Sequence, residues 1–316
     1  MEKLLITTGK QYADIDGFAC AVAYAEAFRL MGLDAEALIP APLNYSVPHF
    51  LLDPLPKYRY DVINNDYSIA NKFIKYTIVD TQDLGSLPDF VDIEKILELY
   101  DHRWGTEEYW KTKLHDNCHI EMVGACATLI WEQIKRFGVE SKISESPKKL
   151  MACAIASNTL NFRSKNTTER DKQAYAEICA ISNIDANLAI NYFTQVQLDI
   201  EKNIETSVIL DTKTLKMRDG TKVTIGQLEI WDGEDFIRNN QFKITQIFNK
   251  LGSKWLLTSP SIKNGYNIFF TRDDEIKHIL DDLLQVQFNG DIAKTDSLWL
   301  RKEIIKKLSD NNIFLF

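Results

Sequence analysis

The sequence of 316 residues is poor in features that mark exported or membrane-spanning chains. Its five cysteines are odd in number and widely spaced, which argues against a disulfide framework and fits reduced thiols in a cytoplasm. The N-terminal apolar run is too short for a signal-peptide core, and no later run is long enough to span a membrane. We therefore expect a cytoplasmic protein without a membrane partner.

Basic residues are also outnumbered by acidic ones. The chain has 37 lysines and arginines against 45 aspartates and glutamates, a formal charge of -8. Because this field repels polyanions, we expect no nucleic acid polymer as a partner, although a small anion could still bind where cations gather. The patterns GxxxxGK[ST], GxGxxG and CxxC are absent, so nucleotide P-loops, dinucleotide folds and zinc ribbons have no support.

The first half of the chain alternates strand-like and helix-like segments. Residues 4–8 form an apolar run, and residues 18–31 are rich in alanine with a helical period. Residues 76–79 and 96–100 have the pattern of buried strands, and each runs into an aspartate. This alternation predicts an α/β domain with a mostly parallel sheet flanked by helices. Four further helices are expected, at 124–137, 148–160, 169–181 and 186–196.

The last third has a different pattern. Residues 207–217 and 222–230 alternate in polarity, are rich in β-branched residues and are joined by Arg218-Asp219-Gly220, which predicts a β-hairpin. We therefore expect a smaller C-terminal α+β domain over residues 196–316, following a first domain over residues 1–195. Its other elements are expected as helices near 235–251, 273–284 and 301–308 and strands near 255–258 and 267–271.

Acidic residues follow the predicted strands of the first domain. Asp14 and Asp16 precede the first helix, Asp80 ends one strand, and Asp101 and His102 end another. The carboxyl ends of parallel strands meet at the edge where open α/β sheets bind ligands, so we expect these groups to converge. Two close carboxylates repel each other unless a cation intervenes, and the donors suit Mg²⁺, Mn²⁺ or Co²⁺. By itself, the Asp14–Asp16 pair could equally cap the helix that follows.

Two other groups of polar residues have ordinary explanations. His115, Cys118 and His119 lack a fourth ligand at zinc-finger spacing, so a surface loop and strand is favoured. Lys306 and Lys307 belong to a helix face that solvent would cover.

Taken in order, the motifs resemble the four signatures of the DHH phosphoesterase superfamily. They are Asp-x-Asp at 14–16, the aspartate after Ile78-Val79, Asp101-His102-Arg103, and EMVGACAT at 121–128. The run AIASNTLNFRSKNTTERD at 154–171 is similar to a segment of manganese-dependent family II inorganic pyrophosphatases. Because the third motif reads Asp-His-Arg, the branch of exopolyphosphatase and Prune is also close. The resemblance implies a DHH-type domain, a C-terminal phosphate-binding domain and an active-site cleft between them.

The resemblance also implies an activity and a set of residues that carry it. The reaction would be hydrolysis of a phosphoanhydride, inorganic pyrophosphate or short polyphosphate, by a water that a metal ion acidifies. The metal, Mn²⁺ or Mg²⁺ with Co²⁺ as an alternative, would be held by Asp14, Asp16, Asp80, His102 and Asn158. The substrate would contact Lys10, Arg103, Lys213, Arg301 and Lys302. The catalytic residues would be Asp80, His102 and Arg103.

Three of these residues depart from the pyrophosphatase pattern, and one is Arg103, which replaces a histidine that contacts substrate. Lys10 stands where those enzymes have a metal-binding histidine, and Asn158 stands where they have an aspartate. A protonated lysine has no lone pair for a metal, and an asparagine oxygen brings no charge. Three aspartates (-3) and Lys10 (+1) sum to -2. We therefore expect one tightly held divalent ion, with Lys10 in part of the space of a second.

Two other functions stay open. The altered ligands also fit a catalytically weak phosphate-binding or protein-interaction module of the Prune type. A phosphodiesterase acting on small nucleotides is the third interpretation, although such enzymes carry a Gly-Gly-Gly-His motif and this chain has no Gly-Gly pair. A homodimer is compatible with the resemblance, and the sequence does not fix the oligomeric state.

Overall fold

The chain divides into two compact units in the computed structural model. The structure describes residues 3–53, 60–62, 75–252 and 254–315. Unit 1 comprises Met1–Phe162 and Asn166–Ala189, and unit 2 comprises Arg163–Lys165 and Ile190–Phe316. The domain boundary expected at residues 195 and 196 falls inside helix α7 (Leu188–Lys202), near whose start the structure divides the chain.

Unit 1 is built on a six-stranded sheet whose strand pairings are all parallel. The strand order is β3-β2-β1-β4-β5-β6. The strands are β1 (Leu4–Thr7), β2 (Ala35–Ile39), β3 (Tyr60–Val62), β4 (Lys75–Val79), β5 (Ile96–Asp101) and β6 (Cys118–Ile120). The direction in which strands are added reverses between β1 and β4, and ligands of such sheets bind at that position.

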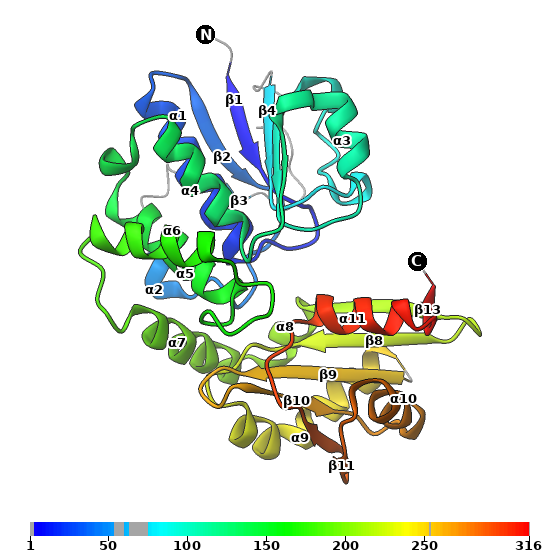
Figure 1. Ribbon diagram of the computed structural model, residues 1–316. Helices are drawn as coiled ribbons and strands as arrows, with labels where there is room; N and C mark the ends of the chain where they lie inside the picture. The colour runs from blue at the N-terminus through cyan, green and yellow to red at the C-terminus, as the bar shows by residue number, and fades with distance from the viewer. Residues whose placement is uncertain (1–2, 54–59, 63–74, 253, 316) are drawn as a thin grey trace. The chain divides into compact units, whose positions relative to one another are not determined.

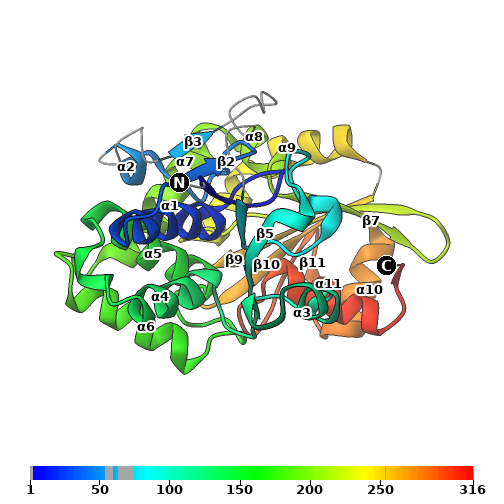
Figure 2. The same ribbon diagram turned by 90° about the horizontal axis from the view of Figure 1, so that it is seen from above.

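Helices cover both faces of this sheet. In Figure 1, α1 and α4 lie on one side of the strands, and α3 lies on the other; Figure 2 shows the same separation from above. The helices are α1 (Ile15–Leu30), α2 (His49–Leu52), α3 (Glu107–Leu114), α4 (Cys126–Arg136), α5 (Glu145–Asn158) and α6 (Glu169–Ala180). Residues 15–28 of α1 are all buried, and its small alanines allow this central position, where it packs against α4 and α5.

Unit 2 contains a seven-stranded mixed sheet of order β11-β12-β10-β9-β8-β7-β13. Only β8 and β9 pair in parallel; the other described pairings of this sheet are antiparallel. The strands are β7 (Thr212–Met217), β8 (Lys222–Gln227), β9 (Lys254–Ser261), β10 (Tyr266–Phe270), β11 (Phe288–Asn289), β12 (Ile292–Lys294) and β13 (Phe314–Leu315). The expected fold class, a parallel α/β unit followed by a smaller α+β unit, is confirmed.

Successive side chains of a strand point to opposite faces of the sheet, and β8 contacts helices on both faces. Val223 and Ile225 of β8 share a core with α10 (Asp274–Leu284) and α11 (Arg301–Asp310). Gly226 points the other way, and a Cβ there would meet Phe248 of α9 (Gly233–Leu251) at 2.6 Å. Glycine at this position therefore lets α9 close on the sheet.

The predicted hairpin is confirmed as β7 and β8, with Gly220 at a φ of +90° in the turn. The prediction that a strand starts at residue 207 is wrong, because residues 204–209 form a short helix, α8 (Ile204–Ile209). The side chain of Asn203 accepts a hydrogen bond from the amide of Thr206, and Ile204 and Val208, one turn apart, are both buried. A cap and a buried helical face thus override the local preference for a strand.

The cysteines fit the expectation of reduced core thiols. All five are free, and Cys20, Cys126 and Cys153 are buried. Burial raises the pKa of the Cys126 thiol to about 12, so this thiol stays protonated and unreactive at neutral pH. Within the described parts of the chain, no helix combines the length and the apolar character that crossing a bilayer requires.

A buried ion pair fastens helix α11 to the sheet of unit 2. The guanidinium of Arg301 donates to the Asp211 carboxylate and to the backbone oxygen of Asp211, and the side chains are only 8% and 9% exposed. The backbone amide of Arg301 also donates to the side chain of Gln227 in β8. Arg301 therefore has a clear structural role, and phosphate binding by this residue stays a prediction.

Arg301→Ala is expected to lower the free energy of unfolding by about 3–5 kcal/mol, because it removes the guanidinium that pairs with the buried carboxylate of Asp211. The neighbouring Lys302→Ala, at a half-buried position, is the matched control and should cost less than about 1 kcal/mol. Urea titration followed by tryptophan fluorescence measures both. Equal small losses in the two variants would show that the ion pair does not hold α11.

Candidate metal centre

Three side chains meet at the carboxyl end of the unit 1 sheet. Asp16 lies in the first turn of α1, Asp80 directly follows β4, and His102 directly follows β5. Nε2 of His102 lies 3.5 Å from Oδ1 of Asp80 and 3.9 Å from Oδ2 of Asp16. Two atoms that each lie about 2.1 Å from one ion can be at most about 4.2 Å apart, so these distances suit common ligation. Among the described residues, this is the one group of three or more His, Cys, Asp or Glu placed to share an ion.

His102 is oriented as a ligand by a backbone carbonyl. Its Nδ1 lies 3.2 Å from the oxygen of Val123, and the ring is almost completely buried. A proton on Nδ1, donated to that oxygen, leaves the lone pair of Nε2 directed at the two carboxylates. Metal-binding histidines in proteins commonly have this second hydrogen bond, which fixes both tautomer and ring orientation.

Asp16 is anchored by the start of a distant helix. Its Oδ2 accepts from the amide of Cys126 and its Oδ1 from the amide of Ala127, both at 2.8 Å, in the first turn of α4. The partial positive charge of a helix N-terminus stabilises this fully buried carboxylate. Oδ1 also accepts from the thiol of Cys20, whereas Oδ2 is the oxygen that faces Nε2 of His102 and is placed to ligate a cation.

Asp14 is instead the cap of α1. Its Oδ1 accepts from the amides of Asp16 and Gly17 at 3.1 and 3.0 Å. The alternative explanation of Asp14 as a capping residue is therefore correct for this oxygen. Asp16 lies inside α1, and its carboxylate accepts from the first amides of α4. Metal binding by Asp14 stays a prediction.

The backbone around Asp80 is unusually constrained. Asp80 has a φ of +52°, in the left-handed region that aspartate and asparagine tolerate better than most residues. Gly17 makes the close approach of α1 possible, because a Cβ there would meet Oγ1 of Thr8 at 2.7 Å and Oδ2 of Asp80 at 3.5 Å. The role of Gly17 was not predicted from the sequence, although a glycine directly after Asp-x-Asp was the visible signal.

Crowded negative charge sets the electrostatics of the site. Burial, together with the nearby charges of Asp14, Asp16 and Asp101, raises the pKa of Asp80 well above its usual range, and Arg103 opposes this shift. A raised pKa means that the ionised form of Asp80 costs folding free energy at neutral pH. A divalent cation would remove that cost.

Arg103 supplies positive charge beside the triad. Its Nη2 lies 2.9 Å from Oδ1 of Asp80, and its Nε lies 3.0 Å from Oδ1 of Asp101. Burial lowers the pKa of Arg103, but the carboxylates of Asp101 and Asp80 outweigh that effect and raise it. Oδ1 of Asp101 also accepts from the amides of His102 and Arg103, which fixes the turn after β5.

The remaining predicted site residues are not part of the triad. The ammonium of Lys10 forms a salt bridge with Asp89 at 2.7 Å, and its expected place in the space of a second metal ion stays a prediction. Asn158 is the half-buried last residue of α5, and ligation by its side chain stays a prediction. In unit 2, Lys213 is exposed on β7 and Lys302 is half-buried on α11. Their contacts with substrate also stay predictions.

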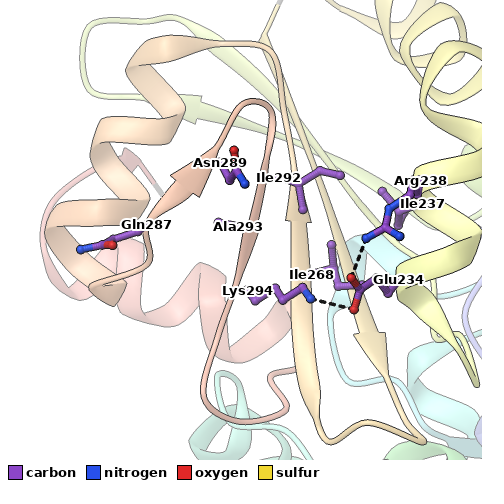
Figure 3. A pocket seen from close by; sticks show the side chains of 9 residues that line it. All are labelled: Glu234, Ile237, Arg238, Ile268, Gln287, Asn289, Ile292, Ala293 and Lys294. Atoms are coloured by element: carbon purple, nitrogen blue, oxygen red, sulfur yellow. Dashed lines mark hydrogen bonds and ion pairs between the residues drawn. The ribbon is translucent and has the colours of Figure 1, made fainter.

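A separate pocket of about 510 Å³ lies in unit 2, beside α9, β10 and β12. Figure 3 shows Arg238 and Lys294 directed at Glu234 from two sides of this pocket. The Glu234 carboxylate accepts from both cations and from the hydroxyl of Tyr266. Because the charged groups of the pocket pair with one another, they indicate no particular ligand.

Sequence comparison finds relatives over most of the chain. A probable manganese-dependent inorganic pyrophosphatase of Exiguobacterium sp. is 28% identical over 255 residues, which cover 79% of this chain and 78% of the relative. A protein of Bacillus licheniformis with the same description is 28% identical over 257 residues, covering 81% and 80%. No protein-family model matches the chain.

Solved structures share the architecture. A Methanococcus jannaschii protein assigned to the family II inorganic pyrophosphatases superposes with a TM-score of 0.70 at 19% identity, covering 98% of this chain and 99% of that one. The chain has the family II pyrophosphatase fold. An exopolyphosphatase-related protein of Bacteroides fragilis follows, with a TM-score of 0.52 at 12% identity and coverage of 98% and 91%. The resemblance to the DHH phosphoesterase superfamily is confirmed.

Asp80→Asn should separate metal binding from folding, because asparagine keeps the shape and tolerates the same backbone conformation. In metal-free protein the variant should melt no lower than wild type, since it removes a carboxylate whose folded-state pKa is raised. Mn²⁺ at about 100 times its Kd should stabilise wild type by about 2.7 kcal/mol and the variant far less. Thermal melts with and without Mn²⁺ measure this, and an equal shift in both proteins would exclude Asp80 as a ligand.

Proposed function

We propose that the protein is a metal-dependent phosphohydrolase that cleaves the phosphoanhydride bond of inorganic pyrophosphate or of short polyphosphate. The observation that carries the proposal is the triad of Asp16, Asp80 and His102, with Nε2 of His102 directed at both carboxylates. The sequence relatives, named as manganese-dependent inorganic pyrophosphatases, support both the substrate class and the metal.

The donor set fits a divalent cation such as Mn²⁺. Two carboxylates and one imidazole offer the mixture of oxygen and nitrogen ligands that Mn²⁺ accepts, with Mg²⁺ and Co²⁺ as alternatives. We propose that Asp14 and Asn158 complete the ligand set. When bound, the ion would lower the pKa of a water molecule and so provide a nucleophile near neutral pH.

Arg103 and Lys10 are the cations of unit 1 that would bind the substrate. The Arg103 side chain is 42% exposed although it pairs with Asp80 and Asp101, so its guanidinium can also donate to a phosphate oxygen. The Lys10 salt bridge joins two partly exposed side chains, and such surface pairs contribute little stability. A phosphate group can therefore replace Asp89 as the partner of Lys10 at small cost.

Unit 2 would add further cations. We propose that Lys213 and Lys302, with Arg301 placed by its ion pair to Asp211, stabilise negative charge on the phosphate groups during cleavage. The free thiols support a reducing compartment, and we propose a cytoplasmic location on that basis.

A second candidate is a catalytically weak phosphate-binding module. Lys10 cannot ligate a metal, and its ammonium pairs with Asp89. By the resemblance, this position would hold a metal-binding histidine in the pyrophosphatases, so a cation here replaces an expected ligand. Such a protein would bind phosphate compounds and turn them over slowly or not at all.

Phosphate release from pyrophosphate, tripolyphosphate and longer chains, each with Mn²⁺, Mg²⁺ or Co²⁺, tests the proposal. We expect metal-dependent release that Asp80→Asn lowers by roughly two orders of magnitude or more, because the variant disables a group at the reacting centre. Asp116→Asn makes the same chemical change at an exposed site of unit 1 and should leave turnover near wild type.

The outcomes separate the two candidates. Binding of pyrophosphate without release under any metal would favour the phosphate-binding module and reject the enzyme. Release that is equally fast in wild type and Asp80→Asn would place the reaction at some other site.

A further inference from the structure

Two of the three triad residues are anchored on one short stretch of chain, residues 123–127, which we call the bracing segment. The oxygen of Val123 faces Nδ1 of His102, and the amides of Cys126 and Ala127 donate to the two oxygens of Asp16. A shift of this segment would therefore rotate the imidazole and move a carboxylate at the same time. The position of the segment matters for ligand geometry even though none of its side chains belongs to the triad.

The bracing segment is itself held by the carboxylate of Asp171, in the first turn of α6. Oδ2 of Asp171 accepts from the amide of Gly124 at 2.8 Å, and Oδ1 accepts from the amide of Ala125 at 3.3 Å. Oδ1 also accepts from Oγ1 of Thr128 at 2.6 Å, just beyond the segment. Asp171 is fully buried, so solvent does not compete for these bonds.

The same carboxylate is tied to its own helix on the other side. The amide and the hydroxyl of Thr168 both donate to Oδ2 of Asp171 at 2.7 Å, within the capping box that starts α6. One buried anion thus receives five donors from two parts of the chain. If the carboxylate moved away, these buried donors would lose their acceptor. Because that loss costs free energy, the position of the carboxylate is fixed.

Glycine at position 124 keeps this contact close. A Cβ on Gly124 would meet Cγ2 of Thr159 at 2.6 Å and Oδ2 of Asp171 at 2.9 Å, both below ordinary contact distances. The segment therefore lies against Asp171 and Thr159 with no room for a side chain. Close packing against Thr159 and hydrogen bonds to Asp171 together fix the position of the first amides of α4.

We propose that Asp171 is a positioning residue of the metal centre, acting through the bracing segment on His102 and Asp16. It does not touch the ion or the substrate. The proposal rests on the proposed function in that the triad must bind a metal. Groups that orient metal ligands typically change metal affinity by about 10- to 100-fold when they are removed, and we expect this range for Asp171.

The alternative is that Asp171 only caps α6, and stability alone does not distinguish the two roles. Glu26 supplies the matched control. It is a buried carboxylate of unit 1 on α1, and its Oε1 accepts from the amide and hydroxyl of Ser144, at the start of α5. Glu26→Gln and Asp171→Asn therefore each replace, with an amide, a buried carboxylate that holds the start of a helix. The difference is that Asp171 is bonded to the bracing segment.

Isothermal titration of each metal-free protein with Mn²⁺, alongside its thermal melt, tests the proposal. Both variants should lose thermal stability, whereas only Asp171→Asn should bind Mn²⁺ at least about tenfold more weakly than wild type. Turnover of Asp171→Asn should recover toward wild type as Mn²⁺ is raised, because the ligands themselves remain. A merely structural cap would not move the metal affinity of the folded protein.

Thr128→Val keeps the test decisive if Asp171→Asn does not fold. It removes one of the five donors to Asp171 and should weaken Mn²⁺ binding by a smaller factor, about threefold. Affinities of both Asp171→Asn and Thr128→Val within error of wild type, or an equal loss in Glu26→Gln, would overturn the proposal. Wild-type protein that binds no Mn²⁺ would instead refute the metal centre. The Mn²⁺ affinity of wild type therefore tests the proposed function, and the ratio of the Asp171→Asn affinity to the wild-type affinity tests the role of Asp171.

Discussion

Negative charge is concentrated in a buried place at the carboxyl end of the unit 1 sheet, and the structure around it serves to hold that charge. Asp16 and Asp80 face one imidazole, and Asp14 and Asp101 lie close enough to raise the pKa of Asp80 further. Buried like charges are costly unless cations or hydrogen-bond donors compensate them. Here Arg103 pairs with Asp80, and the first amides of α4 donate to Asp16.

These compensating groups explain several local features that otherwise look unrelated. Gly17 lets α1 approach Thr8 and Asp80, and the positive φ of Asp80 lies directly after its strand. Gly124 lets the start of α4 approach the chain around Asp171. Backbone strain and close glycine contacts gather where a site must be rigid, because flexible side chains would separate to reduce their repulsion. Such rigidity holds two carboxylates ready for a divalent ion.

The sequence predicted the part of this arrangement that depends on local pattern and sheet topology. Buried strands ending in Asp80 and Asp101, and the alanine-rich helix after Asp16, are visible as periodic runs, and parallel strands bring their carboxyl ends together. The identity of the groups that hold each ligand was not predictable from such patterns. Asp16 is bonded to amides 110 and 111 residues away, and only the folded chain places them there.

The same distinction applies to a contact that the sequence did not indicate and to an element that it predicted wrongly. Lys10 was expected in part of the space of a second metal ion, and the structure adds a contact that no motif indicates, between its ammonium and Asp89, which is distant in sequence. Residues 204–209 have a strand-like composition, but a cap at Asn203 and a buried helical face decide for a helix. A long-range partner thus determined the first outcome, and a local cap together with burial determined the second.

The most direct test is the anomalous scattering of manganese from crystals of the protein grown with Mn²⁺. We expect one strong peak, within about 2.3 Å of carboxylate oxygens of Asp16 and Asp80 and of Nε2 of His102. A peak away from these atoms, or no ordered ion at a concentration that supports hydrolysis, would contradict a metal centre built on this crowded charge.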